Sequence, residues 1–301
     1  MAAGVLIGIA VPPLATLARP LLVPTLLIAL ALALVRLDWA AAGAWRHRPG
    51  VVAALIVFIL GVSPLLVWAI TQALAPLGFP APLAQALVLM AASSPIVSNV
   101  AIALLLKLDA PLAVVVVLLG TALVPVTLPV AANVLVGVTV EMPVAEFMGR
   151  LLALVGSAFV AAWLVRRFVP ARTLAAHHEL LDGLSVLNLL LFGLAIMDGV
   201  TAYAIARPGY VALAIVAAFA FNLLLQAAGG LAFRRLGTTQ ALTVALLAGN
   251  CNMGLVLVAL EGRGSFDVTV FFALAQIPMY TLPALLRHLY ARAAGAAAPS
   301  R

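Results

Sequence analysis

Charged side chains are scarce in this sequence, in which Asp, Glu, Lys and Arg together make up 8% of the 301 residues. A soluble globular domain carries about 25% charged residues, so a soluble fold is excluded. Hydrophobic residues make up 66% of the chain, and they gather in apolar runs long enough to cross a bilayer. The sequence therefore predicts an all-α integral membrane protein that forms one transmembrane unit over residues 1–301.

Cysteine is almost absent as well, since Cys251 is the only one in the chain. One cysteine excludes an internal disulfide and a cysteine-based metal cluster, and we expect no cofactor besides a coupling ion. A net charge of +7 could indicate nucleic acid, but the basic residues stand singly at the ends of apolar runs. That pattern is typical of membrane orientation. The expected surroundings are thus the lipid bilayer and not nucleic acid.

The apolar runs predict ten membrane spans when they are read with a window of about 19 residues. The first run lacks the charged n-region and cleavage site of a removable signal, and we expect it to remain as a helix. Only residues 18–20, Ala-Arg-Pro, divide the first two spans, so an alternative merges them into one hairpin-like unit. The spans cover roughly residues 3–18, 20–36, 51–73, 81–106, 110–136, 144–168, 181–204, 209–233, 239–260 and 266–289.

Positive charges are distributed unequally between the two sides of these spans. Of the 16 Lys and Arg residues, 12 follow even-numbered spans and 4 follow odd-numbered spans. The positive-inside rule then places both termini in the cytoplasm, as expected for a multi-pass protein of the inner (plasma) membrane. Five spans per half is an odd number, so the halves would insert with opposite orientations. The predicted architecture is an inverted five-plus-five repeat over about residues 1–140 and 141–295.

Two of the predicted spans, the fourth and the ninth, carry polar interruptions. In the ninth span, residues 249–254 read Gly-Asn-Cys-Asn-Met-Gly; the glycines loosen the helix, and the amides need partners that lipid lacks. In the fourth span, residues 93–99 read Ser-Ser-Pro-Ile-Val-Ser-Asn, and Pro95 breaks or kinks the helix because it cannot donate a backbone hydrogen bond. Such centres are tolerated only against protein or a water-filled cavity. We expect two broken helices that cross.

Paired interruptions at matching places in two halves indicate the binding site of a transporter. The N-termini of half-helices carry partial positive charge and free N–H groups, which suit an anionic group. The simpler alternative is that Ser, Asn and Gly only join helices, but two matching clusters with helix breakers favour a site. We predict that a small organic solute, expected to be anionic, contacts Ser93, Ser94, Ser98, Asn99, Asn250 and Asn252.

Other intramembrane polar residues have less specific interpretations. Asp198 is the deepest carboxylate in the predicted spans, and intramembrane acids are candidates for proton relays. It stands within about two turns of the outer end of its span, so an acid at the membrane interface is the main alternative. Four buried amides are expected to join helices, although any of them could face a cavity: Asn188, Asn222, Gln226 and Gln276.

The preferred function is an alternating-access carrier. No nucleophile–base pair, Walker loop or dinucleotide loop accompanies the polar centres, which argues against an enzyme. A channel would need a continuous polar stripe through several helices, whereas the polarity here is confined to the middle of the membrane. A non-transporting receptor usually needs an attached signalling domain or a partner subunit, and the oligomeric state is not defined by the sequence.

At these residues the sequence resembles the bile acid:sodium symporter family, in the wider superfamily that includes arsenite carriers. The resemblance covers most of the chain in the number and order of spans. It implies ten helices, an inverted repeat, a panel domain and a core domain, with substrate and sodium beside the crossing of helices four and nine. It rests on Ser98-Asn99-Val100, Lys107-Leu108-Asp109, Thr121, Pro125, Thr127, Pro129, Thr243, Gly249, Asn252 and Gly254.

The sequence departs from this family where the resemblance places sodium ligands. The family has a Glu seven residues before the glycine that matches Gly254, and a Gln three residues before it. This chain has Leu247 and Cys251 at those positions. Hydroxyl groups expected early in the fifth helix fall on Ala113 and Val117.

The remaining candidate ion ligands are Ser98, Asn99 and, with a sulfur in place of an amide, Cys251. Because a hard cation prefers several oxygen ligands, we predict that sodium coupling is weakened or lost. A proton, exchange or the gradient of the solute would then supply the driving force. The alternatives are a sodium-coupled organic-anion symporter with a sodium site built from backbone carbonyls, and a membrane receptor on the same fold.

Overall fold

The computed structural model describes residues 1–137, 142–260 and 263–293, and every regular element in this part of the chain is helical. The prediction of an all-α membrane protein is confirmed. Within the described residues, seven helical runs are long and apolar enough to cross a membrane: Pro12–Arg36, Pro49–Leu77, Ala110–Val136, Val144–Phe168, His178–Ala195, Pro208–Ala232 and Phe266–Leu285.

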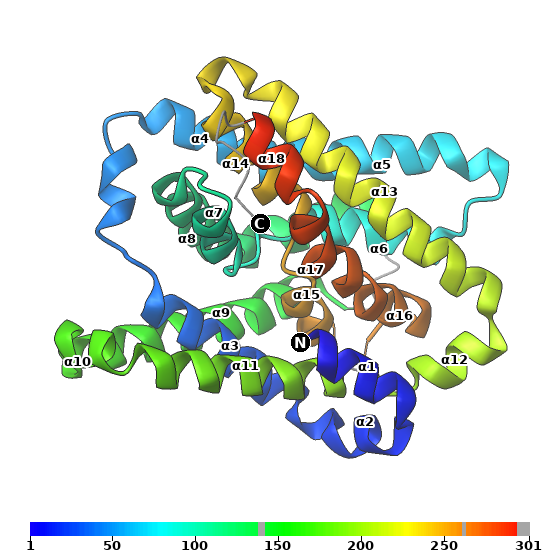
Figure 1. Ribbon diagram of the computed structural model, residues 1–301. Helices are drawn as coiled ribbons and strands as arrows, with labels where there is room; N and C mark the ends of the chain where they lie inside the picture. Colours follow the sequence, from blue (N-terminus) through cyan, green and yellow to red (C-terminus); the bar gives the residue numbers. More distant parts are fainter. Residues whose placement is uncertain (138–141, 261–262, 294–301) are drawn as a thin grey trace.

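The helices within these runs are labelled in Figure 1. They are α2 Pro12–Ala18, α3 Leu22–Arg36, α4 Pro49–Val57, α5 Ser63–Leu74, α8 Ala110–Ala131, α9 Val144–Phe168, α11 His178–Ala195, α13 Pro208–Ala232, α16 Phe266–Leu274 and α17 Gln276–Leu285. Two interrupted helices are formed by α6 Ala81–Ala92 with α7 Asn99–Leu105, and by α14 Thr238–Gly249 with α15 Met253–Ala259. The short helices are α1 Ala2–Ala10, α10 Ala171–Ala176, α12 Val200–Ala206 and α18 Arg287–Ala293.

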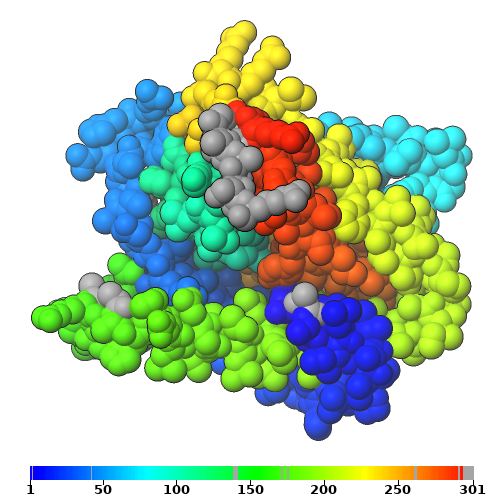
Figure 2. All heavy atoms as spheres, viewed as in Figure 1, coloured from blue at the N-terminus to red at the C-terminus, as the bar shows by residue number. Residues whose placement is uncertain are grey.

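The long helices pack in two groups. In the first group, α3 packs against α9 and α11, and α1 and α2 pack against α11. In the second group, α13 packs along α14 and α16, and α6 packs against α5, α8 and α16. Figure 1 shows the first group along the lower edge of the molecule, and in Figure 2 the green α11 and the dark-blue α1 and α2 form one face. The groups meet where α8 packs against α9 and at the interrupted helices, where α15 contacts both α3 and α9.

The first two spans are divided at a different place from the prediction. Val11 leaves the helical conformation between α1 and α2, with φ −129° and ψ 74°, whereas residues 19–21 continue the run as a 3-10 turn. Pro12 explains the break, because the residue before a proline is disfavoured in the helical region. The predicted division at residues 18–20 is wrong, and the single run Pro12–Arg36 is closer to the merged alternative.

The span predicted at residues 181–204 is also interrupted, since α11 ends at Ala195 and α12 begins at Val200. Gly199 precedes α12 with φ +73°, and a Cβ atom at this position would lie 2.9 Å from the Phe266 ring. Both the left-handed backbone and the close approach of the ring require glycine. The turn carries Asp198 out of the long helix.

Candidate functional site

The first interruption separates α6 from α7. Helix α6 ends at Ala92, and Ser93 is extended with ψ 160°. Pro95 lies in the middle of this non-helical segment. It has no backbone N–H group to donate a helical hydrogen bond, so the helix does not continue through it. The Ser93 hydroxyl donates to the carbonyl of Met90 at 2.8 Å, which satisfies one of the carbonyls left free at the end of α6.

The second interruption separates α14 from α15 and is shorter. Helix α14 ends at Gly249, and Asn250 leaves the helical region with φ −96° and ψ 84°. Asn252 precedes α15, and its side-chain oxygen accepts from the backbone N–H of Leu255 at 3.3 Å. This is the ordinary N-cap function of asparagine. The expectation that polar residues break both helices is therefore confirmed.

The two interruptions pair with each other through their backbones, and we call residues 93–98 and 250–252 the crossing. The N–H of Ile96 donates to the carbonyl of Asn250 at 2.9 Å, and the N–H of Asn252 donates to the carbonyl of Ser94 at 2.7 Å. Pro95 and Cys251 form an isolated antiparallel bridge between these bonds. Each broken helix thus satisfies backbone groups that the other leaves free, which a lipid environment demands.

Side-chain amides reinforce the crossing. The Asn99 amide nitrogen donates to the Asn250 carbonyl at 3.0 Å, and the Asn250 amide nitrogen donates to the Asn99 side-chain oxygen at 3.2 Å. Both residues are fully buried. Because they lie in opposite halves of the chain, this reciprocal pair fastens α7 to the break before α15.

A chain of buried side-chain hydrogen bonds continues from Asn250 to Tyr290 on α18. Asn222 on α13 donates to the Gly249 carbonyl at 2.9 Å and to the Asn250 side-chain oxygen at 3.2 Å. Gln226 donates to the Asn222 side-chain oxygen at 2.7 Å, and the Tyr290 hydroxyl donates to Gln226 at 2.7 Å. We call Asn99, Asn250, Asn222, Gln226 and Tyr290 the amide chain. It confirms that Asn222 and Gln226 join helices.

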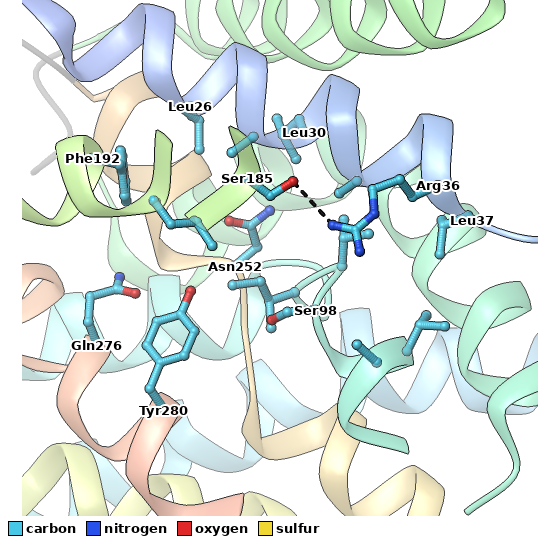
Figure 3. A pocket seen from close by; sticks show the side chains of 18 of the residues that line it. Leu26, Leu30, Arg36, Leu37, Ser98, Ser185, Phe192, Asn252, Gln276 and Tyr280 are labelled. Atoms are coloured by element: carbon cyan, nitrogen blue, oxygen red, sulfur yellow. Dashed lines mark hydrogen bonds between the residues drawn. The ribbon is translucent and has the colours of Figure 1, made fainter. Parts of the chain in front are cut away.

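A cavity of about 310 Å³ lies beside the crossing, where α3 and α11 of the first group face α7 and α17. Helices α7 and α17 pack against α8 and α13 of the second group. Its volume is at the lower end of the range for small-molecule sites, about 300–1,000 Å³. Most of its wall is apolar. Figure 3 shows Arg36 at one end, Ser98 and Asn252 near the middle, and Gln276 and Tyr280 at the other end. The polar lining consists of Arg36, Ser98, Ser185, Asn252, Gln276 and Tyr280.

The predicted contact residues occupy two different places. Ser98 and Asn252 line the cavity. The other four have no exposed surface and do not line the cavity in this conformation: Ser93, Ser94 and Asn250 in the crossing, and Asn99 at the start of α7. Cys251 is also buried, and its thiol donates to the Ala248 carbonyl at 3.5 Å.

Several lining residues were not predicted as contacts. The sequence predicts Gln276 only as an amide that joins helices or faces a cavity, and it faces the cavity. Arg36 was interpreted through membrane orientation alone, although it is the only charged residue among the described residues that line the cavity. Tyr280 and Phe192 carried no sequence signal, because the direction of a side chain on a uniformly apolar helix cannot be read from its neighbours.

Three buried hydroxyls near the crossing have no hydrogen-bond partner within the part of the chain that the structure describes: those of Ser94, Ser98 and Thr121. A buried hydroxyl without a partner costs about 1–3 kcal/mol. The Ser98 hydroxyl is the one that belongs to a cavity-lining residue. Its oxygen is buried in this conformation, so a bound solute could satisfy it after a local movement of the cavity wall.

The positions where the family resemblance places sodium ligands are apolar and closed. Leu247, Ala113 and Val117 have no exposed surface. The described residues also contain no group of three or more His, Cys, Asp or Glu side chains that could hold a metal ion. The crossing instead joins its own amides and carbonyls to each other.

Asp198 lies apart from the crossing and the cavity. Its two carboxylate oxygens accept from the Thr16 hydroxyl at 2.7 Å and from the Arg19 guanidinium at 3.2 Å. The pair joins the turn after α11 to the α2 end of the first group. This geometry gives Asp198 a structural partner, and its role in proton coupling stays a prediction.

Comparison with protein families gave one match. The model of the Sodium Bile acid symporter family matches residues 23–207, which is more than half of the chain. The matched range contains α3, α11 and the first interruption, and the second interruption follows it. Comparison with curated proteins gave no match.

Proposed function

Because the chain belongs to the sodium bile acid symporter family, we propose that it moves a small organic anion across the membrane by alternating access. Membership of a symporter family makes the chain a multi-pass membrane transporter of an organic solute and not an enzyme. The observation that carries the finer proposal is the cavity beside the crossing, a largely apolar space whose polar lining includes Arg36, Ser98 and Asn252.

The proposed architecture is the inverted repeat of five plus five spans, with α6–α7 as the fourth helix and α14–α15 as the ninth. The two packing groups support it. The first group holds the first two predicted spans of each half, and the second group holds the remaining three of each half. In this proposal the groups move relative to each other, and the cavity between them opens alternately to either side.

An anionic substrate is supported by the charges around the cavity. Arg36 contributes a guanidinium, and no Asp or Glu is present among the described residues of the lining. Arg36 pairs with Asp182, which does not line the cavity, so an amphipathic anion that displaces this carboxylate would bind better than its neutral or cationic analogues. Ser98, Asn252, Gln276 and Tyr280 would orient the polar groups of such a solute.

Sodium-independent or weakened coupling completes the proposal. The amide chain and the paired backbones already engage the amides and several backbone carbonyls of the crossing. Of the side-chain oxygens there, the Ser94 and Ser98 hydroxyls lack a partner among the described residues, so a cation that prefers several oxygen ligands would have to displace hydrogen bonds to bind. Apolar side chains occupy the positions of the family's carboxylate and hydroxyl ligands. Proton coupling, exchange or the gradient of the solute would then drive transport.

Uptake of radiolabelled cholate into proteoliposomes tests this function. We expect saturable uptake with the same initial rate in sodium and in potassium, and a loss of about tenfold or more in Asn252→Ala, since a polar contact to a charged solute is removed. Faster uptake in sodium alone would support the sodium-coupled alternative. Binding without flux would support a receptor.

Asn252 also caps α15, so a second N-cap variant serves as the control. Ser265 caps α16 by accepting from the Asp267 N–H at 3.2 Å, and it does not line the cavity. Ser265→Ala loses a comparable cap and should keep normal uptake. Equal losses in both variants would show that capping, not contact with the solute, explains the effect of Asn252→Ala.

We also propose the inner membrane as the location, with both termini and Arg48 on the cytoplasmic side. Cys251 is the only native cysteine and is buried, so an introduced cysteine can be labelled against a low background. We expect Arg48→Cys to react with a membrane-impermeant maleimide in inside-out vesicles and not in right-side-out vesicles. The reverse pattern would contradict this orientation.

A further inference from the structure

We propose that Arg36 is the residue that selects anions. In the structure its guanidinium is held by Asp182 and Ser185 of α11, and the anionic end of a solute takes the place of Asp182. This inference rests on the proposed function and goes further, because it names the group recognised and the substrate class: an amphipathic organic monoanion.

The position of Arg36 makes it suited to this role. Arg36 is in the last turn of α3, and it lines both the cavity and a second hollow of about 430 Å³ between α3, α9 and α11. The second hollow is also lined by Arg166, His178 and Asp182. Arg36 is the only described residue that lines both hollows, so its side chain borders both spaces.

The contacts of Arg36 can be exchanged. One guanidinium nitrogen donates to the Ser185 hydroxyl at 3.1 Å, and another pairs with a carboxylate oxygen of Asp182. Figure 3 shows the bond to Ser185 at one end of the cavity. The side chains of Arg36 and Asp182 are 39% and 51% exposed, and ion pairs of this exposure are weak. A carboxylate or sulfonate that offers two oxygens to the planar guanidinium can replace such a partner.

Capping of α3 is the simplest structural role for an arginine in this position, but another residue already performs it. Arg166 of α9 donates to the carbonyls of Val35 and Leu37 at 2.8 and 3.0 Å. These bonds satisfy groups at the end of α3 that an arginine in its last turn would otherwise serve. The Arg36 guanidinium is directed to side-chain oxygens of α11 instead.

The rest of the lining defines the solute class. Leu26, Leu30 and Phe192 supply apolar wall between the Arg36 end and the far end of the cavity, where Gln276 and Tyr280 place an amide and a hydroxyl. A matching solute has one anionic end, an apolar body and a neutral polar group at its other end. A dianion would leave its second charge among apolar or neutral groups, which is costly.

Calorimetric titration in lipid nanodiscs with charged and uncharged probe pairs tests the assignment. The pairs are cholate with its primary amide, and the smaller 4-phenylbutyrate with its primary amide. We expect the wild-type protein to bind at least one acid about tenfold or more tightly than its amide. Arg36→Gln should abolish that preference by weakening the acid alone. Asp182→Asn should tighten the acid and leave the amide unchanged, because it removes the competing carboxylate.

Arg167→Gln is the matched control, since Arg167 is an exposed arginine in the last turn of α9 and lines neither hollow. It should retain the preference for the acid. Equal affinity for acid and amide in the wild type, or equal weakening of both in Arg36→Gln, would overturn the role of Arg36 while leaving the carrier function intact. Failure of all four probes to bind the wild type would overturn the proposed function, and the role of Arg36 with it.

Discussion

Gly249→Ala is expected to destabilise the protein strongly, because Gly249 lies where α14 closely approaches α13. A Cβ atom at Gly249 would lie 2.5 Å from the Cγ atom of Gln226 and 2.8 Å from the backbone oxygen of Asn222. The Asn222 oxygen belongs to the backbone of α13 and cannot rotate away. The methyl group would therefore separate α13 from α14, at a cost of about 1–3 kcal/mol for overpacking.

The same methyl group would also disturb the amide chain. The side-chain oxygen of Asn222 lies 2.8 Å from the added Cβ, and Asn222 donates to Gly249 and Asn250. Loss of these bonds adds about 1 kcal/mol each, so the total cost is several kcal/mol. The measurement is the midpoint of thermal unfolding in detergent at one fixed scan rate, because membrane proteins often unfold irreversibly.

Gly156→Ala is the control for this substitution. Gly156 lies inside α9, and a Cβ atom there would meet nothing within 4 Å. Alanine has the higher helix propensity, so Gly156→Ala should leave the midpoint unchanged or raise it slightly. If both variants unfolded at the same temperature, the close approach of α13 to Gly249 would not contribute to stability.

Both interruptions could be predicted from the sequence because their causes are local. Pro95 removes a backbone donor whatever surrounds it, and residues 249–254 place amides where lipid offers no partner. The consequence of each break is equally local, because a broken helix leaves backbone N–H and C=O groups that need hydrogen-bond partners. The backbone pairing of Ile96 with Asn250 follows from that need once the two helices meet.

The amide chain and the charge at the cavity could not be predicted, because they depend on which way helices face. Ala, Leu and Val fill most faces of α13 and α17, so no periodic pattern fixes the direction of Asn222, Gln226 or Tyr280. In the sequence, Arg36 is a positive charge at the end of a span, which membrane orientation explains by itself. Nothing in the sequence therefore indicates that its side chain also borders a cavity. Only the packing of α3 against α11 shows that its side chain borders a cavity.

The span boundaries were also predicted wrongly because the sequence pattern does not contain the detail that decides them. The charge at Arg19 suggested a loop, but residues 19–21 accommodate Pro20 in a 3-10 turn, and the break falls at Val11 before two prolines. Within a run of uniform hydropathy, backbone geometry decides where a helix ends. Hydropathy averaged over about 19 residues cannot resolve an effect that belongs to one or two.

Asn222→Leu is also expected to destabilise the protein strongly. Leucine and asparagine are similar in size, so the loss comes from hydrogen bonds and not from a cavity. It removes the partner of the Gly249 carbonyl, of the Asn250 side-chain oxygen and of the Gln226 amide nitrogen. Three buried polar groups would be left unsatisfied. At about 1 kcal/mol for each group, the free energy of unfolding should fall by about 3 kcal/mol, and cholate uptake should fall with the integrity of the crossing.

Asn188→Leu provides the comparison, because this buried amide makes one hydrogen bond, to the Thr25 carbonyl at 2.8 Å, and joins α11 to α3. Its cost should be about one third of that of Asn222→Leu. Equal destabilisation of the two variants would show that the amide chain adds nothing beyond a single bond.

Sodium supplies a second readout. If the amide chain takes the place of a cation, sodium should not stabilise the wild type. Restoration of the Asn222→Leu midpoint by sodium, and not by potassium, would show that the unpaired oxygens of the crossing can still recruit the ion.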